Sequence, residues 1–353
     1  MPPAPAAVAS PSASEPRGAS ADRSGWLVSD DPGWRVLAVT GEDAAPFLHA
    51  LLTGDVRSLA PGSGRLAGLL DRKGHLQAAL LVHRAGEDLL LVVPQPAAGS
   101  VAETLMSHRI MDRVEVEERT DLAVASLSGS GVPLLLSGWG VATDGEGWRP
   151  GDGATIDGVR LVRTRLTGEI DLFAIGEPGA VRRLFARLAG SVRRISQDEI
   201  ERLRIEAGLA GQGHEIDGRR LPQEIDLHDL VSLDKGCYLG QETMARLTHR
   251  GQARKGLAGW ILGEGEPPRP PCPVYLAGEE VGDLTSVSPG SPATGLPALG
   301  ILKTEAFDPR GDYRFGSPGG ATGRLAALPF VKGSGYDVDP RRRPAPATEG
   351  PRS

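Results

Sequence analysis

The sequence predicts an α+β protein in which a small β domain follows a larger mixed region. Between residues 26 and 252, strand-like alternation and helical spacing of apolar residues are interleaved, without the regular βαβ repeat of a parallel sheet. Beyond about residue 256, short apolar runs are separated by Gly- and Pro-rich turns, a pattern typical of a small barrel or sandwich. The length of 353 residues exceeds that of one ordinary core, so we expect two or three domains.

The first half of the mixed region predicts strands packed with helices. The segment "WRVLAVTGEDAAPFLHALLTGDV" opens with a strand over residues 36–39 and continues with apolar residues at helical spacing. The segment "GRLAGLLDRKGHLQAALLVHRAGEDLLLVVP" predicts two or three strands joined by turns at residues 71–74 and 85–88. A helix from about Ser100, a strand after it and another strand over residues 122–127 complete this half.

Two later helices have clear boundaries. Ser196 and Glu199 predict a capping box at the start of "SQDEIERLRIEAG", and Gly208 marks its end. The segment "GQETMARLTHRG" predicts a helix that begins near Gln241 and stops at Gly251. In the small β domain, strands are expected over residues 257–262, 274–277, 280–287, 298–303 and 324–329.

Composition divides the chain into four parts. Residues 1–24 are rich in Pro, Ala and Ser without periodicity, and residues 333–353 resemble them, so both ends are expected to be disordered. Between them lie the mixed region, residues 25–252, in which we expect two interleaved subdomains, and the small β domain, residues 253–332.

Charge and hydropathy exclude several classes of partner. The formal net charge is -6 and the pI is about 5.7, so the chain has no overall positive charge for nucleic acid, and we expect no direct nucleic-acid partner. No stretch reaches the roughly 18 apolar residues of a membrane span, and the N-terminal segment lacks the apolar core of a secretory signal. We therefore expect a cytoplasmic protein without membrane contact, whose cysteines are reduced.

Cys237 is the first candidate for chemistry. Gly236 before it frees the backbone for a positive φ or for the close approach of another molecule. Lys235 and the start of the following helix both favour a thiolate. The alternative is a small buried hydrophobe in a tight turn. Cys272, in "PPCPVY", is expected to be structural, and two cysteines cannot build a four-thiolate metal site, so no metal site is predicted.

Glu206 is the second candidate. It occupies the last turn of its helix, where the helix dipole disfavours a carboxylate, so its charge is either solvated or held for a ligand. A carboxylate accepts two parallel N–H bonds from a guanidine-like edge such as the pterin of folate. Alternatively, Arg202 or Arg204 neutralises Glu206 on an exposed face.

From Arg204 to Leu257 the sequence resembles the YgfZ family of folate-binding proteins, relatives of the glycine-cleavage aminomethyltransferase. The family pattern Lys-Gly-Cys-Tyr/Phe-x-Gly-Gln-Glu is intact, and "RIEAG" precedes it. Weaker similarity covers most of the ordered chain, including "VTGEDAAPFLHALLTGDV" and "GEEVGDLTSVS". The residues that carry the family pattern are Lys235, Gly236, Cys237, Tyr238, Gly240, Gln241 and Glu242.

The resemblance implies a multi-domain α+β ring around a central channel for tetrahydrofolate or a related reduced folate, with a small C-terminal β-barrel. Members of the family support assembly or repair of iron–sulfur enzymes, including tRNA-modifying ones, so the implied partners are folate and iron–sulfur enzymes or cluster-assembly proteins. Cys237 matches the family's functional thiol. At the folate site the resemblance implies Glu206 against the pterin, with Arg204, Lys235, Tyr238 and Gln241 nearby.

One departure from the related aminomethyltransferases separates two hypotheses. Those enzymes place an aspartate soon after a strand that ends in Val-Asn, but here Pro94 stands at the asparagine position and no acid precedes Glu103. We therefore favour a folate-binding accessory protein over a folate-dependent one-carbon transferase. A transferase would need another acid, and Asp55 is the early candidate, although it also suits a turn cap. A regulator that binds folate without chemistry is a third possibility.

The basic run over residues 246–255 has three possible roles. It could bind RNA, bind the glutamate tail of folate, or form the edge of a core-facing helix. Because the run lacks interleaved aromatic residues, we favour the last two roles.

Overall fold

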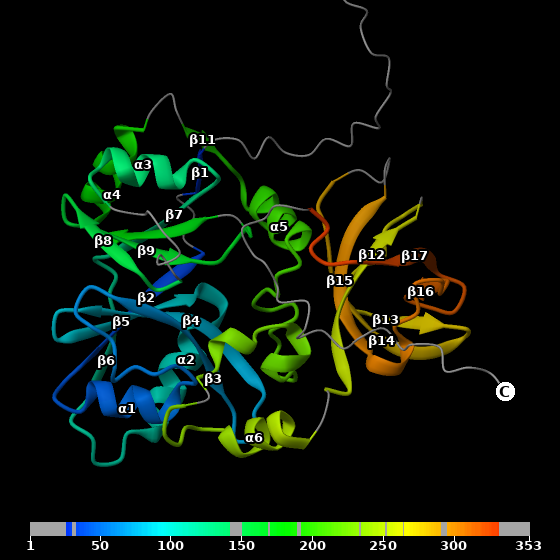
Figure 1. The fold of residues 1–353 in the computed structure, drawn as a ribbon, viewed down its shortest axis with the longest axis horizontal. Helices are drawn as coiled ribbons and strands as arrows, with labels where there is room; N and C mark the ends of the chain where they lie inside the picture. The colour runs from blue at the N-terminus through cyan, green and yellow to red at the C-terminus, as the bar shows by residue number, and fades with distance from the viewer. Residues whose placement is uncertain are drawn as a thin grey trace, which may run out of the picture.

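The computed structural model describes residues 26–29, 33–141, 150–168, 170–188, 192–232, 234–250, 253–263, 265–290 and 295–331 (Figure 1). Within them the chain forms a six-stranded sheet, a five-stranded sheet and a closed six-stranded barrel, joined by helices. The predicted α+β class with a C-terminal β-barrel is confirmed. The disorder expected for residues 1–24 and 333–353 concerns segments outside the described residues. No helix in the described ranges is both long and apolar enough to cross a membrane.

The five-stranded sheet is antiparallel and has the order β3-β4-β5-β2-β6. Strand β2, which lies between β5 and β6, is buried on both faces. Leu37 and Val39 pack in the core under the helices, whereas Val36 and Ala38 pack against the second sheet. The elements are β2 (Trp34–Thr40), α1 (Ala44–Leu51), β3 (Gly64–Leu70), β4 (Leu76–Ala85), β5 (Asp88–Pro94), α2 (Gln95–His108) and β6 (Glu115–Glu118).

The six-stranded sheet has the order β11-β1-β7-β10-β9-β8. Strand β10 is buried along its whole length, because one face packs under helices and the other, through Phe173 and Ile175, meets the five-stranded sheet. The elements are β1 (Trp26–Ser29), β7 (Ala123–Ser128), α3 (Val132–Gly138), β8 (Gly153–Ile156), β9 (Val159–Thr164), β10 (Asp171–Gly176), α4 (Pro178–Ala186) and β11 (Val192–Arg194).

The C-terminal barrel closes in the order β12-β15-β14-β13-β16-β17. Trp260 fills its centre, and its ring lies edge-on to Tyr313 and Phe315, at centroid distances of 6.0 and 5.7 Å. The elements are β12 (Lys255–Leu262), β13 (Cys272–Leu276), β14 (Glu279–Val287), β15 (Leu296–Lys303), a 3-10 turn (Thr304–Ala306), β16 (Tyr313–Phe315) and β17 (Ala321–Ala326).

A helical segment connects the stacked sheets to the barrel, and α5 lies between them (Figure 1). Helix α5 (Gln197–Glu206) begins at the predicted capping box, in which Ser196 and Glu199 exchange side-chain-to-backbone hydrogen bonds. It ends before Gly208, whose φ is +68°. The segment continues with the 3-10 turns η1 (Pro222–Ile225) and η2 (His228–Leu230) and ends with α6 (Gln241–Arg250).

A buried carboxylate ties this segment to the barrel. The Glu215 side chain has no solvent exposure, and its two oxygens accept four hydrogen bonds. One oxygen accepts from Gly211 N at 2.8 Å and from Arg204 Nη1 at 3.0 Å. The other accepts from the hydroxyls of Thr285 and Ser286 on β14, at 2.5 and 2.7 Å. A buried carboxylate with every oxygen satisfied holds three segments in one arrangement.

Arg204 completes the junction because all five of its N–H donors are engaged. Nε and Nη2 each donate one hydrogen bond to the Glu201 carboxylate. Nη2 also donates to Ser286 Oγ at 2.9 Å. Nη1 donates to Glu215 and to the Leu209 carbonyl. Burial by itself would raise the pKa of Glu215, but the charge of Arg204 and the hydrogen bonds from the other three donors lower it below its usual value.

We expect Glu215→Gln to lower the free energy of unfolding by about 3 kcal/mol near neutral pH, because Arg204 then loses its buried counter-charge. A lowered carboxylate pKa stabilises the fold above the ordinary value of 4.5 and loses this effect as the pH falls. Urea unfolding between about pH 6 and pH 3 should therefore show a smaller loss of stability for the variant than for the wild type. Glu279→Gln, at an exposed position of β14, is the control. A variant as stable as this control would contradict the role of the junction.

Candidate functional site

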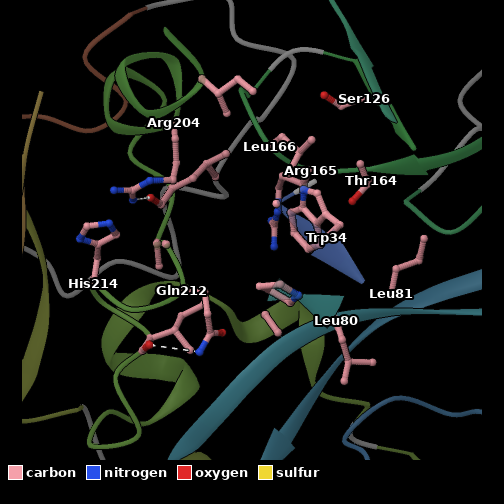
Figure 2. Close-up of a pocket in the computed structure, with 18 of the residues that line it drawn as sticks. Trp34, Leu80, Leu81, Ser126, Thr164, Arg165, Leu166, Arg204, Gln212 and His214 are labelled. Atoms are coloured by element: carbon pink, nitrogen blue, oxygen red, sulfur yellow. Dashed lines mark hydrogen bonds between the residues drawn. The ribbon is translucent and has the colours of Figure 1, made fainter. Parts of the chain in front are cut away.

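A cavity of about 580 Å³ lies where the two sheets meet α5 and the segment after it (Figure 2). Its size falls within the usual range for small-molecule sites. Strand β4 supplies Leu80 and Leu81 to its wall, and the six-stranded sheet supplies Ser126 and Thr164. Most of the lining is apolar, so the few polar groups set the orientation of a bound molecule.

Helix α5 presents one carboxylate to this cavity. Gln197, Ile200, Glu201 and Arg204 line it, which is the spacing of a single helix face. Glu201 is the one acidic residue among the lining residues of the described chain. Arg204 donates to the two carboxylate oxygens of Glu201 at 2.8 and 2.5 Å. His214 Nε2 lies 3.7 Å from Glu201 Oε1. Burial would raise the pKa of Glu201, but Arg204 and His214 lower it, so the cavity faces an ionised hydrogen-bond acceptor.

The opposite side of the cavity combines aromatic surface with positive charge. The Trp34 ring packs on Phe173 with a centroid distance of 4.6 Å. Figure 2 shows Arg165 beside Trp34, across the cavity from Arg204 and His214. Arg165 Nη2 lies 2.9 Å from Asp229 Oδ1, which joins the six-stranded sheet to η2. The cavity therefore has an acceptor on one side and a guanidinium on the other.

Glu206, the acid that the sequence indicates, lies outside the cavity lining. Arg202 donates to its carboxylate at 2.8 Å, as one interpretation of the sequence expected, but the Glu206 side chain is only 14% exposed, so the expected exposed face is wrong. Helix geometry explains the placement, because five residues rotate the side chain by about 140° from Glu201. Contact between Glu206 and folate stays a prediction. Of the residues expected at the folate site, Arg204 lines the cavity, and it does so with every donor already engaged.

Lys235 caps α1. Its ammonium group donates to the carbonyls of His49, Leu52 and Gly54, at 2.5, 2.5 and 3.0 Å. Carbonyls at a helix C-terminus lack intrahelical partners, so a buried cation there satisfies several of them at once. Burial lowers the pKa of Lys235 to about 8. With all three hydrogens engaged, the ammonium has none left for the thiol of Cys237.

Tyr238 and Gln241 also shape the loop. The Tyr238 side chain is buried in an apolar cluster with Leu70, Leu76 and Met244, and this burial raises its pKa. Gln241 Oε1 accepts from Tyr238 N at 3.3 Å at the start of α6. Glu242 follows in the first turn of α6 and is exposed. None of Lys235, Tyr238, Gln241 and Glu242 is among the cavity-lining residues of the described chain.

The two glycines of the loop have different roles. Gly240 has a φ of +80°, and a Cβ there would stand 2.4 Å from the Asp71 carbonyl oxygen. Gly236 does not adopt a positive φ, so that expectation is wrong. A Cβ at Gly236 would meet nothing within 4 Å, which agrees with its other expected role of leaving room for another molecule.

Cys237 is a free, exposed thiol. Its exposure excludes the buried-hydrophobe alternative, but the thiol is not part of the cavity lining. Cys272 is free and half-buried in β13, where burial raises its pKa. No three His, Cys, Asp or Glu side chains gather to hold a metal ion within the described ranges. The basic run over residues 246–255 falls mostly on side chains that the structure does not describe.

Sequence reasoning missed Glu201, Trp34, Arg165 and Asp229. Glu201 had a detectable signal, because it lies three residues before Arg204 on a helix with well-marked ends. Trp34, Arg165 and Asp229 come from three distant segments, and no local pattern connects them.

The chain is thus an α+β protein with a C-terminal barrel and a cavity of the size that small molecules occupy. The family model described as the GCVT N-terminal domain matches residues 21–235, more than half of the chain, so this chain belongs to that family. The aminomethyltransferase of Streptomyces avermitilis is 29% identical over 275 residues, which cover 74% of this chain and 73% of that protein. The tRNA-modifying protein YgfZ of Yersinia pseudotuberculosis is 25% identical, with coverage of 72% and 76%.

A solved structure shows the same fold. The glycine cleavage system aminomethyltransferase T of Bartonella henselae has a TM-score of 0.74 and 22% identity, and the match covers 87% of this chain and 86% of that one. Membership of the wider family is confirmed by the family model, whereas the finer resemblance to YgfZ stays a prediction. The two kinds of relative are about equally distant, so the choice between them depends on the site.

We expect Gly240→Ala to lower the free energy of unfolding by more than about 2 kcal/mol, since it adds both backbone strain and a clash with Asp71. Gly236→Ala is the matched control in the same loop and should change stability by less than about 0.5 kcal/mol. Urea unfolding of both variants tests this. Equal effects would contradict the described geometry of the loop.

Proposed function

We propose that this protein binds tetrahydrofolate, or a related reduced folate, in the cavity and supports assembly or repair of iron–sulfur enzymes through the thiol of Cys237. The carboxylate of Glu201 carries the first part of this proposal, because it is ionised, fixed by Arg204 and turned toward the cavity. The intact family pattern and the exposure of Cys237 support the second part.

The lining fits a reduced folate. A pterin presents an amino group and ring N–H donors along one edge, and these are complementary to a fixed carboxylate. Trp34 and Leu81 offer flat and apolar surface for the ring. Arg204 acts as a positioning residue, since it orients Glu201 and keeps it ionised while having no donor left for the ligand.

The cavity supports binding better than aminomethyl transfer. Pro94, Gln95 and Pro96 line the cavity at the segment where the aminomethyltransferases place their aspartate, and none of them is acidic. Asp55 lies outside the lining, where it accepts from Ser58 N at 3.3 Å in a turn. Turnover of tetrahydrofolate with a methylated amine by the pure protein would favour the transferase instead.

The thiol acts on a partner from outside the cavity. Cys237 is exposed beside an unobstructed Gly236, so a second protein reaches the sulfur without entering the folate site. One cysteine cannot hold an iron–sulfur cluster alone, so the remaining ligands would come from an iron–sulfur enzyme or a cluster-assembly protein. Thiolate donation to a cluster and exchange with an oxidised partner cysteine are both compatible with this exposure.

We expect calorimetric titration to give micromolar binding of tetrahydrofolate by the wild type and an affinity about 10- to 100-fold weaker for Glu201→Gln, the usual loss for a charged hydrogen bond. Glu206→Gln is the matched control on the same helix and should stay within about threefold of the wild type. Thermal melts identify any loss of folding. If Glu206→Gln loses affinity and Glu201→Gln does not, Glu206 and not Glu201 contacts the pterin.

We expect Cys237→Ser to fail to restore iron–sulfur enzyme activity in a deletion strain while binding tetrahydrofolate as the wild type does, because the thiol lies outside the cavity. Cys272→Ser, at the half-buried cysteine, should restore activity. Full complementation by Cys237→Ser would remove the thiol from the function and favour a regulator that binds folate without chemistry.

A further inference from the structure

We propose that Arg165 binds a carboxylate of the ligand's glutamate tail, which takes the place of Asp229. The proposal rests on the proposed function, because it assigns the anionic half of a folate to the wall opposite Glu201. Two arginines line the cavity in the described chain, and Arg204 has no donor left. Arg165 is therefore the guanidinium that can change partner.

The backbone under Arg165 is fixed in advance. Asp171, which is fully buried, accepts from Leu166 N at 2.8 Å, from Thr167 N at 3.0 Å and from the Thr167 hydroxyl at 2.7 Å. These bonds hold the two residues directly after Arg165. The Arg165 side chain is only 8% exposed, so its direction is also restricted. A guanidinium held in this way loses little entropy when it binds a carboxylate.

The ion pair between Arg165 and Asp229 can separate. The Asp229 side chain is 41% exposed, so water can solvate its carboxylate after the pair separates. Water on the exposed side of Asp229 screens the pair, so it is weaker than a pair buried on both sides. A ligand carboxylate inside the cavity is less screened and can accept two parallel bonds from the same guanidinium. The exchange therefore favours the ligand.

The charges of the cavity match the two ends of a folate. Glu201 provides an acceptor for the N–H donors of the pterin, and Arg165 provides a cation for the carboxylate tail. Figure 2 shows Arg165 on the side of Trp34, with Arg204 and His214 on the other side. A reduced pterin without a tail can bind Glu201 but has no carboxylate for Arg165.

Calorimetric titration with two ligands tests this proposal. Tetrahydrofolate has both pterin and carboxylates, whereas 6-methyltetrahydropterin has the reduced pterin alone. We expect Arg165→Gln to weaken tetrahydrofolate binding about 10- to 100-fold and to leave methyltetrahydropterin binding within about threefold. Arg119→Gln, which breaks an Arg–Asp pair on the surface, should change neither affinity.

Asp229→Asn gives a second, independent measurement at an exposed position. Removal of the competing carboxylate should strengthen tetrahydrofolate binding about two- to fivefold and leave methyltetrahydropterin binding unchanged. If Arg165→Gln does not fold, this variant decides the question. Arg165→Lys, which keeps the charge and loses the planar fork, should weaken tetrahydrofolate binding by an intermediate factor.

Several results would overturn the proposal. An equal loss for both ligands in Arg165→Gln would show that Arg165 only shapes the cavity. Unchanged tetrahydrofolate binding in Arg165→Gln or in Asp229→Asn would show that Arg165 does not exchange its partner. If the wild type binds both ligands equally well, the role of the tail is refuted but folate binding is not. A wild type that binds neither would instead refute folate binding itself.

Discussion

The buried pair of Arg204 and Glu215 is the interaction on which the rest of the site depends. Charges are costly to bury unless every polar atom finds a partner, and here the guanidinium makes five hydrogen bonds and the carboxylate accepts four. Because these partners come from α5, from the loop after it and from β14, one arrangement of the three segments satisfies them all. The same arrangement turns Glu201 toward the cavity.

The family-pattern loop shows a similar division of roles. Lys235, Tyr238, Gln241 and Gly240 all face inward or meet backbone, where they cap α1, fill an apolar cluster and close a tight turn. Cys237 remains exposed as a result. Most residues of the pattern therefore support the loop, and the thiol is left exposed to other molecules.

The cavity and the thiol loop share one apolar cluster. Ile216, Leu227 and Leu230 line the cavity and also belong to the cluster that buries Tyr238, next to Cys237 in the chain. Thr53 strengthens this wall, because its buried hydroxyl donates to the Leu230 carbonyl and accepts from Gly68 N. The cavity and the thiol therefore share one support, although Cys237 is not part of the cavity lining.

The sequence by itself determined the α+β class, the C-terminal barrel, the start of α5 and the wider GCVT family, because these depend on local periodicity, capping residues and a contiguous pattern. Only the tertiary structure decided that α5 turns Glu201 to the cavity while Glu206 pairs with Arg202, and that Lys235 caps a helix nearly two hundred residues earlier in the chain. Sequence spacing specifies which side chains share a helix face. Which part of the protein that face packs against depends on contacts between distant segments, so no local sequence pattern predicts it.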